Sequence, residues 1–360
     1  MKRFLILLFI LLASTAVCAQ TPVPELKGDG DVNFFKLPPD LHFGETSGVA
    51  VNSKGHVFVF SRGNTNGPAY GASAAQLLEF DRNGKFIREI GKNLYAWSYA
   101  HVVRVDKDDN IWAVDKGSDM VVKFNPEGRV VMVFGRKKEA SDEAVPWTRV
   151  NPPRPAIDGM FRQPTDVTWD TEGNIFISDG YINSRVAKFD KNGNWIKQWG
   201  DRGTKPGEFN TPHSIASDAK GNIYVADRAN RRIQVFDPNG TFIRAIIIDV
   251  PFDPATRPAI GNMPSPEGGA AQNGAPWAIC ISPGPNQVLF SSDAYPGRLY
   301  KLTLEGKMLG VFGKTGKQAG QFGWIHEIAC PSENELYVAE ILNWRVQKLT
   351  LRPTTTMSSR

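Results

Sequence analysis

The sequence predicts an all-β fold, a six-bladed β-propeller, from two repeated patterns. An outer hairpin occurs five times with a turn glycine in one register, at Gly84, Gly128, Gly193, Gly240 and Gly306. An inner pair of strands occurs six times, as in "DVTWDTEGNIFISD" and "SIASDAKGNIYVAD". Six copies of a four-stranded unit are typical of a propeller, whose blades surround a central channel.

The N-terminus predicts a signal peptide over residues 1–19. Lys2 and Arg3 precede an apolar run over 4–12, and Val17 and Ala19 suit signal peptidase, so we expect cleavage before Gln20. The apolar run is too short to remain in a membrane. We therefore expect a secreted or periplasmic protein with no membrane segment after cleavage.

The propeller is expected over residues 20–352, followed by a disordered tail over 353–360. The sixth copy ends in "RVQKLTLR" and lacks an outermost strand, whereas "DVNFFKL" (31–37) has no place in the repeat. We expect this N-terminal segment to pair with the sixth copy and close the ring. Two stretches rich in proline and glycine, 138–160 and 250–276, interrupt the repeat, and long loops of this kind are commonly functional.

Charge and cysteine content limit the class of protein. The 360-residue chain has a formal net charge of +5, which falls to about +3 (5 − 2) when Lys2 and Arg3 are removed. This charge does not predict nucleic-acid binding, and we expect a monomer. Cys280 and Cys330 lie in apolar strands, which favours two unpaired buried side chains, although an oxidising compartment allows a disulfide.

One position of the inner strands suggests a metal site. Through the six blades, this column holds Ser47, His101, Thr165, His213, Trp277 and His326. Since inner strands line the channel, histidines in the second, fourth and sixth blades would direct three imidazoles to its axis. Three imidazoles with an open fourth position are the ligand set of a catalytic zinc site. The alternative is three polar residues in a wet channel, but the alternation of blades favours a metal.

Several segments resemble the peptidyl-α-hydroxyglycine α-amidating lyases, six-bladed propellers of the NHL-repeat class. They include "PHSIASDAKGNIYVADRANRRIQVF", "SDGYINSRVAKFDKNGNWIKQWG", "GKNLYAWSYAHVVRVDKDDNIWAVD" and "FSRG". The resemblance covers nearly the whole mature chain. It implies an enzyme that cleaves peptidyl α-hydroxyglycine to a peptide amide and glyoxylate, with zinc held by His101, His213 and His326. The expected partner is a peptide or small molecule with such an end.

The same resemblance implies three catalytic residues. Tyr181 in "SDGY" takes the place of the catalytic tyrosine, and Arg62 and Arg228 take the places of two active-site arginines. Cleavage of a carbinolamide needs a base for the hydroxyl proton, a role that suits a tyrosine beside zinc and arginines. Arginine also binds carboxylates through two hydrogen bonds. Without the resemblance, these residues would be interpreted as ordinary residues at the corners of the blades.

The resemblance further implies a structural calcium ion. Its ligands would be the backbone carbonyls of Val49 and Val103 and the side chain of Glu327, where the family usually has aspartate. The sequence also has Trp324 where the family commonly has methionine. The metal and catalytic residues are therefore retained, whereas the surroundings of the substrate differ.

A column of acids ends the second strands, at Asp115, Asp179, Asp227, Asp293 and Glu340. A repeated acid at a strand end typically accepts hydrogen bonds from the backbone, so we predict a structural role for this column. Two other functions stay open: a non-catalytic NHL propeller that binds a protein or glycan, and a metal-dependent lactonase or other hydrolase on the same fold. The alternate-blade histidines favour an enzyme over a binding module.

Overall fold

The computed structural model describes residues 23–63, 75–138, 151–259 and 272–352. The predicted signal peptide and tail lie outside the described residues, as do residues 139–150 and 260–271 of the two stretches rich in proline and glycine. Within the described ranges, no helix is long and apolar enough to cross a membrane.

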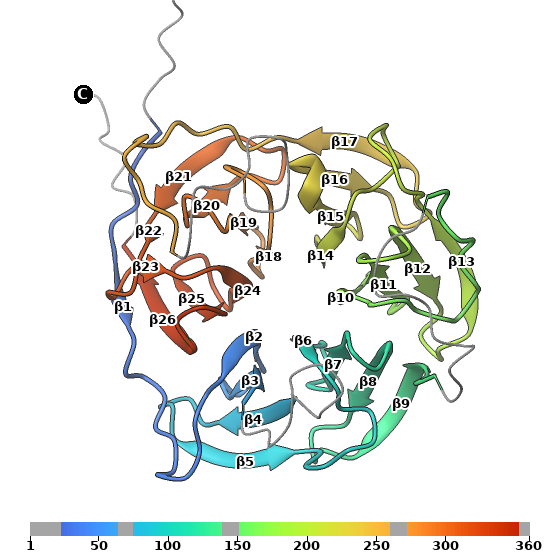
Figure 1. The fold of residues 1–360 in the computed structure, drawn as a ribbon, viewed down its shortest axis with the longest axis horizontal. Helices are drawn as coiled ribbons and strands as arrows, with labels where there is room; N and C mark the ends of the chain where they lie inside the picture. Colours follow the sequence, from blue (N-terminus) through green and yellow to red (C-terminus); the bar gives the residue numbers. More distant parts are fainter. Residues whose placement is uncertain (1–22, 64–74, 139–150, 260–271, 353–360) are drawn as a thin grey trace, which may run out of the picture.

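Six antiparallel four-stranded sheets are arranged as blades around one axis, which confirms the predicted propeller (Figure 1). Blades 1 to 3, each from the axis outward, contain β2 (Glu45–Val51), β3 (Val57–Arg62), β4 (Gln76–Phe80) and β5 (Phe86–Ile90); β6 (Ala100–Val105), β7 (Ile111–Asp115), β8 (Met120–Phe124) and β9 (Val130–Gly135); β10 (Asp166–Trp169), β11 (Ile175–Asp179), β12 (Arg185–Phe189) and β13 (Trp195–Trp199). Blades 4 to 6 contain β14 (Pro212–Ser217), β15 (Ile223–Asp227), β16 (Arg232–Phe236) and β17 (Phe242–Ile246); β18 (Ile279–Ile281), β19 (Leu289–Ser292), β20 (Leu299–Leu302) and β21 (Met308–Phe312); β24 (Ile325–Ala329), β25 (Glu335–Glu340), β26 (Arg345–Leu351) and β1 (Gly28–Asp31). A short parallel ribbon, β22 (Lys314–Thr315) with β23 (Gln321–Phe322), and one 3₁₀ turn, η1 (Arg228–Asn230), complete the described elements.

The outer hairpins turn where the sequence predicts. The five turn glycines all have positive φ, between +79° and +98°. This conformation is accessible to glycine without the steric cost that a side chain brings. The glycine register therefore fixes where each third strand ends and each fourth strand begins.

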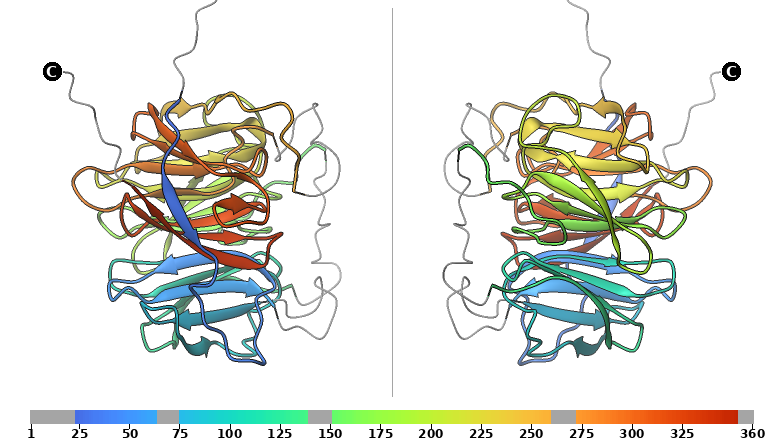
Figure 2. Two further views of the ribbon diagram at one scale, coloured as in Figure 1. Left: turned by 90° about the vertical axis from the view of Figure 1, so that its left-hand side faces the viewer. Right: turned by 90° about the vertical axis from the view of Figure 1, so that its right-hand side faces the viewer.

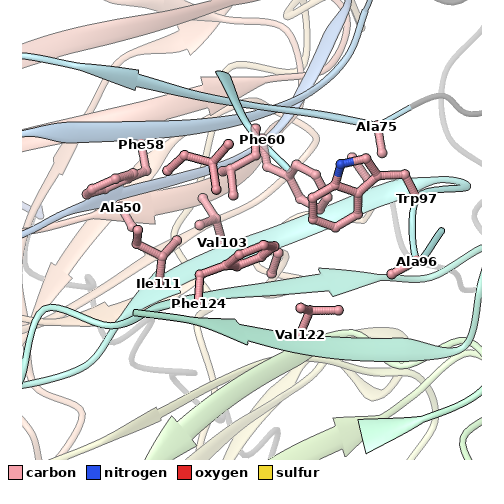
Figure 3. Close-up of a cluster of buried hydrophobic side chains, with 14 of the residues drawn as sticks. Ala50, Phe58, Phe60, Ala75, Ala96, Trp97, Val103, Ile111, Val122 and Phe124 are labelled. Atoms are coloured by element: carbon pink, nitrogen blue, oxygen red, sulfur yellow. The ribbon is translucent and has the colours of Figure 1, made fainter. Parts of the chain in front are cut away.

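The core consists of apolar layers between neighbouring blades. Between blades 1 and 2, Phe58 and Phe60 of β3 face Val103, Ile111 and Phe124 of the next sheet (Figure 3). Equivalent clusters fill the other junctions, including the one between blade 6 and blade 1. Each blade thus packs against two others, and the inner strands are held in a closed ring.

The ring closes through the N-terminal segment, but through different residues from those expected. β1 pairs with β26 over Gly28–Asp31 rather than over 31–37. Glycine is required here, because a Cβ atom on Gly30 would lie 2.7 Å from Gln347 Oε1 and 2.8 Å from the Gly320 nitrogen. Phe34 and Phe35 instead pack into the layer between blades 6 and 1.

The same segment also contacts the blades on both sides of blade 6. The Leu26 N–H donates to the Val311 carbonyl of β21 in blade 5, and the Lys36 N–H donates to the Gly84 carbonyl in blade 1. Figure 2 shows the segment running across the outer edges of these sheets. It therefore acts as a strap over three blades.

Cys280 and Cys330 form a disulfide, contrary to the unpaired state that the sequence analysis favoured. Cys280 lies in β18 of blade 5, and Cys330 directly follows β24 of blade 6. Apolar strands indicated burial, but they could not show that the two inner strands lie side by side. The bond adds a covalent link across one junction of the ring.

Candidate metal centre and active site

The column of acids holds the segments that lead into the inner strands, as predicted. Each carboxylate accepts a hydrogen bond from a backbone N–H three residues before the histidine column: Asp115 from Ser98, Asp179 from Arg162, Asp227 from Asn210, Asp293 from Gly274 and Glu340 from Gly323. These acids are fully buried. They fix the point at which each inner strand begins, including the three that carry histidines.

Each of the three histidines is the extra residue of a β-bulge. The pairing between first and second strands skips His101 in blade 2, His213 in blade 4 and His326 in blade 6. It also skips Ser47 in blade 1. A bulged residue is left out of the ladder, and its side chain is redirected relative to its neighbours. The bulges allow the three imidazoles to converge.

A backbone carbonyl of the next blade fixes the orientation of each imidazole. The Nδ1 to carbonyl oxygen distances are 2.6 Å from His101 to Thr165, 2.7 Å from His213 to Trp277 and 2.7 Å from His326 to Ser47. Since a carbonyl only accepts, Nδ1 carries the hydrogen, and the lone pair of the neutral ring is on Nε2. The three other members of the column thus orient the three histidines.

The three histidines fit a zinc ion. They are buried, their ring centroids lie 4.6 to 5.0 Å apart, and their candidate ligand atoms all lie within 4.8 Å of one another. Among the described residues, this is the one group of three or more histidines, cysteines or acids close enough to bind a single ion. Three imidazoles without a fourth protein ligand are the donor set of a catalytic zinc site.

The surroundings keep these imidazoles neutral. Burial is the main cause that holds the pKa of His101, His213 and His326 well below the usual value. The positive charges of Arg62, Arg228 and Lys116 act in the same direction. Neutral imidazole is the form that binds metals, so the electrostatics agree with the geometry.

Tyr181 places its hydroxyl at the metal-binding face of the histidines. The oxygen lies 3.1 Å from His213 Nε2 and 3.3 Å from His101 Nε2. Burial by itself raises the pKa of Tyr181, but the charges of Lys116, Arg228 and Arg62 outweigh it, so the pKa lies below its usual value. A lowered pKa favours the phenolate, which can accept a proton.

Arg228 has an unused donor beside Tyr181. It begins η1, is only 8% exposed, and its Cζ lies 4.5 Å from the ring centroid of Trp277 and 5.5 Å from that of Tyr181. Its Nε is buried and has no hydrogen-bond partner in the described part of the chain. An unpaired buried donor is costly, so this atom is suited to receive an anionic ligand.

Arg62, by contrast, is already bound to protein groups. Nε donates to the Ala100 carbonyl at 2.8 Å, and Nη1 pairs with Glu45 at 2.6 Å. The guanidinium lies 4.0 Å from the ring centroid of Tyr99. Arg62 therefore supplies a fixed positive charge and holds the backbone next to His101.

Lys116 is a residue of the site that the sequence analysis missed. Its Nζ lies 4.1 Å from the ring centroid of Tyr181 and 5.2 Å from that of Tyr99, and the residue is 9% exposed. Lys116 directly follows the second strand of blade 2. Arg62 is the last residue of the second strand of blade 1, and Arg228 directly follows the second strand of blade 4. Comparison of this corner position among the blades would have found it.

The residues expected to bind calcium meet around Glu327. The N–H groups of Val49 and Val103 donate to the Glu327 carboxylate. The other oxygen of Glu327, Oε1, lies 2.9 Å from Arg104 Nη2, but it is buried and accepts no hydrogen bond within the described residues. The expected calcium ligands are the carbonyls of these valines rather than their N–H groups, so the calcium ion stays a prediction.

Arg104 connects several blades near the axis. It comes from blade 2, pairs with Asp166 of blade 3 through two hydrogen bonds, and reaches Ser214 Oγ of blade 4 at 3.2 Å. Burial opposes its charge, but Asp166 and Glu327 raise the pKa of Arg104 above its usual value. Burial raises the pKa of Glu327 well above its usual value, and Arg104 opposes this effect.

Comparisons with known proteins agree with the fold and the motifs. A family model described as a 6-bladed beta-propeller matches residues 160–259. The peptidyl-glycine alpha-amidating monooxygenase of Mus musculus is 29% identical over 249 residues, which are 62% of this chain and 24% of that protein. The probable peptidyl-alpha-hydroxyglycine alpha-amidating lyase of Caenorhabditis elegans is 31% identical over 215 residues, 55% of this chain and 57% of that protein.

The chain therefore spans less than two thirds of the length of these relatives. Among solved structures, a streptogramin B lyase aligns with a TM-score of 0.55 at 15% identity, covering 90% of this chain and 98% of that one. This likeness shows the fold alone. The relatives confirm the family resemblance that the sequence motifs indicated.

Proposed function

We propose that this relative of the peptidyl-α-hydroxyglycine α-amidating lyases is a zinc-dependent carbon–nitrogen lyase. Its substrate would be a peptidyl or N-acyl α-hydroxyglycine, and its products an amide and glyoxylate. The observation that supports this most strongly is the Tyr181 hydroxyl, 3.1 Å from His213 Nε2 and surrounded by buried cations. A histidine cluster alone would suit many metal sites, but the adjacent tyrosine supplies a base.

His101, His213 and His326 would hold the metal through Nε2. Zinc bound there would provide a Lewis acid that lowers the pKa of the substrate hydroxyl. The carbonyls bonded to Nδ1 keep the imidazoles in the tautomer that this role requires.

Tyr181 would act as the general base. It removes the hydroxyl proton, the oxygen electron pair forms the C=O bond of glyoxylate, and the C–N bond breaks. The amide nitrogen takes up a proton, so neither water nor an oxidant is consumed. Lys116, Arg62 and Arg228 favour the deprotonated tyrosine that begins this sequence.

Arg228 would bind the carboxylate of the hydroxyglycine. Its Nε is the buried donor without a described partner, and guanidinium groups bind carboxylates strongly. Arg62 is anchored to Glu45 and Ala100, so we assign it a positioning and electrostatic role. The two arginines, which the sequence treated alike, therefore contribute differently.

The test is glyoxylate release from N-benzoyl-α-hydroxyglycine by the zinc-loaded protein and by Tyr181→Phe. Loss of a general base typically lowers the rate about 10²- to 10⁴-fold. Zinc content should not change, because the phenol is not one of the three histidine ligands. Tyr95→Phe is the matched control, since Tyr95 is 68% exposed and should keep full activity.

Equal activity of wild type and Tyr181→Phe would show that Tyr181 is not the base. Absence of glyoxylate from both would contradict the proposed reaction. Lactone hydrolysis, or binding of a protein or glycan without turnover, would then become the leading alternatives.

A further inference from the structure

The groups around the three histidines are divided into a cationic side and an apolar side. At the corner where the second strand ends, blades 1 to 6 hold, in order, Arg62, Lys116, Gly180, Arg228, Ala294 and Ile341. The cations thus belong to blades 1, 2 and 4, with Tyr181 of blade 3 among them. Blades 5 and 6 present apolar groups at the same position.

A tryptophan pair extends the apolar side to the histidines. The Trp277 ring centroid lies 5.4 Å from that of His213 and 6.2 Å from that of His326. Trp324 packs on Trp277 with ring centroids 5.3 Å apart, and both belong to one cluster with Ala294 and Ile341. We call these four residues the tryptophan wall.

The two tryptophans differ in exposure. Trp277 is 7% exposed and is covered partly by the Arg228 guanidinium, 4.5 Å from its ring centroid. Trp324 is only partly buried. Trp277 therefore supports Arg228 and Trp324, whereas Trp324 retains surface that a ligand can cover.

This division gives a direction to a bound substrate. In an N-acyl α-hydroxyglycine, the carboxylate and the acyl group lie on opposite sides of the carbon–nitrogen bond that breaks. Because the Arg228 guanidinium lies 4.5 Å from the ring centroid of Trp277, an acyl group next to a carboxylate bound by Arg228 would come within reach of the tryptophan wall. Apolar surface there is stabilised when an apolar group covers it.

We propose that the tryptophan wall selects substrates whose acyl side carries an aromatic or large apolar group next to the scissile nitrogen. This inference rests on the proposed lyase function and adds the substrate class to it. Trp324 is assigned the direct contact with that group, and Trp277 the support beneath it.

The test compares kcat/KM for N-benzoyl-, N-acetyl- and N-succinyl-α-hydroxyglycine. The benzoyl compound should be preferred over the acetyl compound by roughly 10- to 100-fold, the range that burial of an aromatic group supplies. The succinyl compound is larger than the acetyl compound but charged, so it should gain nothing from its size. The comparison of these three substrates needs only the wild-type protein.

Trp324→Ala should reduce the ratio of benzoyl to acetyl kcat/KM to below about 5. The benzoyl value should fall because the substitution removes most of the apolar contact between residue 324 and the benzoyl ring. Trp344→Ala is the control, because Trp344 belongs to the same blade but is 61% exposed and lies outside the tryptophan wall. It should leave the ratio unchanged. Zinc content and melting temperature show whether Trp324→Ala has folded. If it has not, Trp324→Phe is used instead, and its ratio of benzoyl to acetyl kcat/KM should lie between the wild-type ratio and the one expected for Trp324→Ala.

The possible results distinguish failure of the acyl-group specificity from failure of the lyase function. Equal kcat/KM for all three substrates, or an unchanged ratio in a folded Trp324→Ala, would overturn the specificity inference and leave the lyase function standing. No glyoxylate from any of the three would overturn the proposed function itself.

Discussion

Replacement of Arg104 by methionine should destabilise the propeller strongly. The guanidinium is 13% exposed and pairs with Asp166 and Glu327, whose side chains are 0% and 1% exposed. Methionine keeps much of the side-chain volume but leaves two buried acids without their cation. Removal of one partner from a buried ion pair costs about 3–5 kcal/mol of unfolding free energy. Urea denaturation followed by tryptophan fluorescence measures this loss.

One matched variant and one added ion help to interpret the stability loss of Arg104→Met. Lys348→Met removes a cation whose partner Glu335 is 41% exposed, and such surface pairs contribute about 0–1 kcal/mol. Calcium added to the zinc-loaded wild type tests the expected calcium site separately, because an ion bound by Glu327 and the carbonyls of Val49 and Val103 should raise the urea midpoint. A loss below about 1 kcal/mol in Arg104→Met would refute this account of the axis.

Three further predictions concern the metal and the closure of the ring. Wild type should contain about one zinc per chain by elemental analysis, whereas His213→Ala should lose it with an unchanged circular dichroism spectrum; His56→Ala, which alters a histidine paired with Glu79, should keep it. A chain starting at Pro38 lacks β1 and should melt well below the full mature chain in calorimetry; equal melting temperatures would contradict closure by the strap. Replacement of Cys280 and Cys330 by serine should cost about 4 kcal/mol in urea denaturation, from the chain entropy of a loop closed over 50 residues; an unchanged midpoint would contradict a stabilising disulfide.

The sequence predicted features that depend on local or repeated patterns. Each turn glycine specifies its own hairpin through a positive φ, so Gly84 and its counterparts located the outer strands. Alignment of the repeats placed His101, His213 and His326 in one column, and the structure brings them together. The acid column was interpreted correctly because a strand-end carboxylate acts on a nearby backbone segment.

Features that depend on distant contacts were missed or misplaced. Gly30 suits the closing strand because a Cβ atom there would lie 2.8 Å from the backbone nitrogen of Gly320, a contact that strand propensity does not encode. No sequence pattern singled out Arg104, since its partners Asp166 and Glu327 come from other blades. The β-bulges at the histidines depend on the register of two strands, which a single-strand pattern does not reveal.

The identity of the products formed from one substrate tests the central claim most directly. Zinc-loaded protein is incubated with N-benzoyl-α-hydroxyglycine, and amide, acid and glyoxylate are quantified by mass spectrometry after subtraction of the uncatalysed reaction. A lyase in which Tyr181 removes the hydroxyl proton consumes no water, so benzamide and glyoxylate should form in equal amounts without benzoic acid. An amide hydrolase would instead release benzoic acid and α-hydroxyglycine, which breaks down to ammonia and glyoxylate, so benzoic acid in place of benzamide would contradict the lyase function, as would absence of turnover.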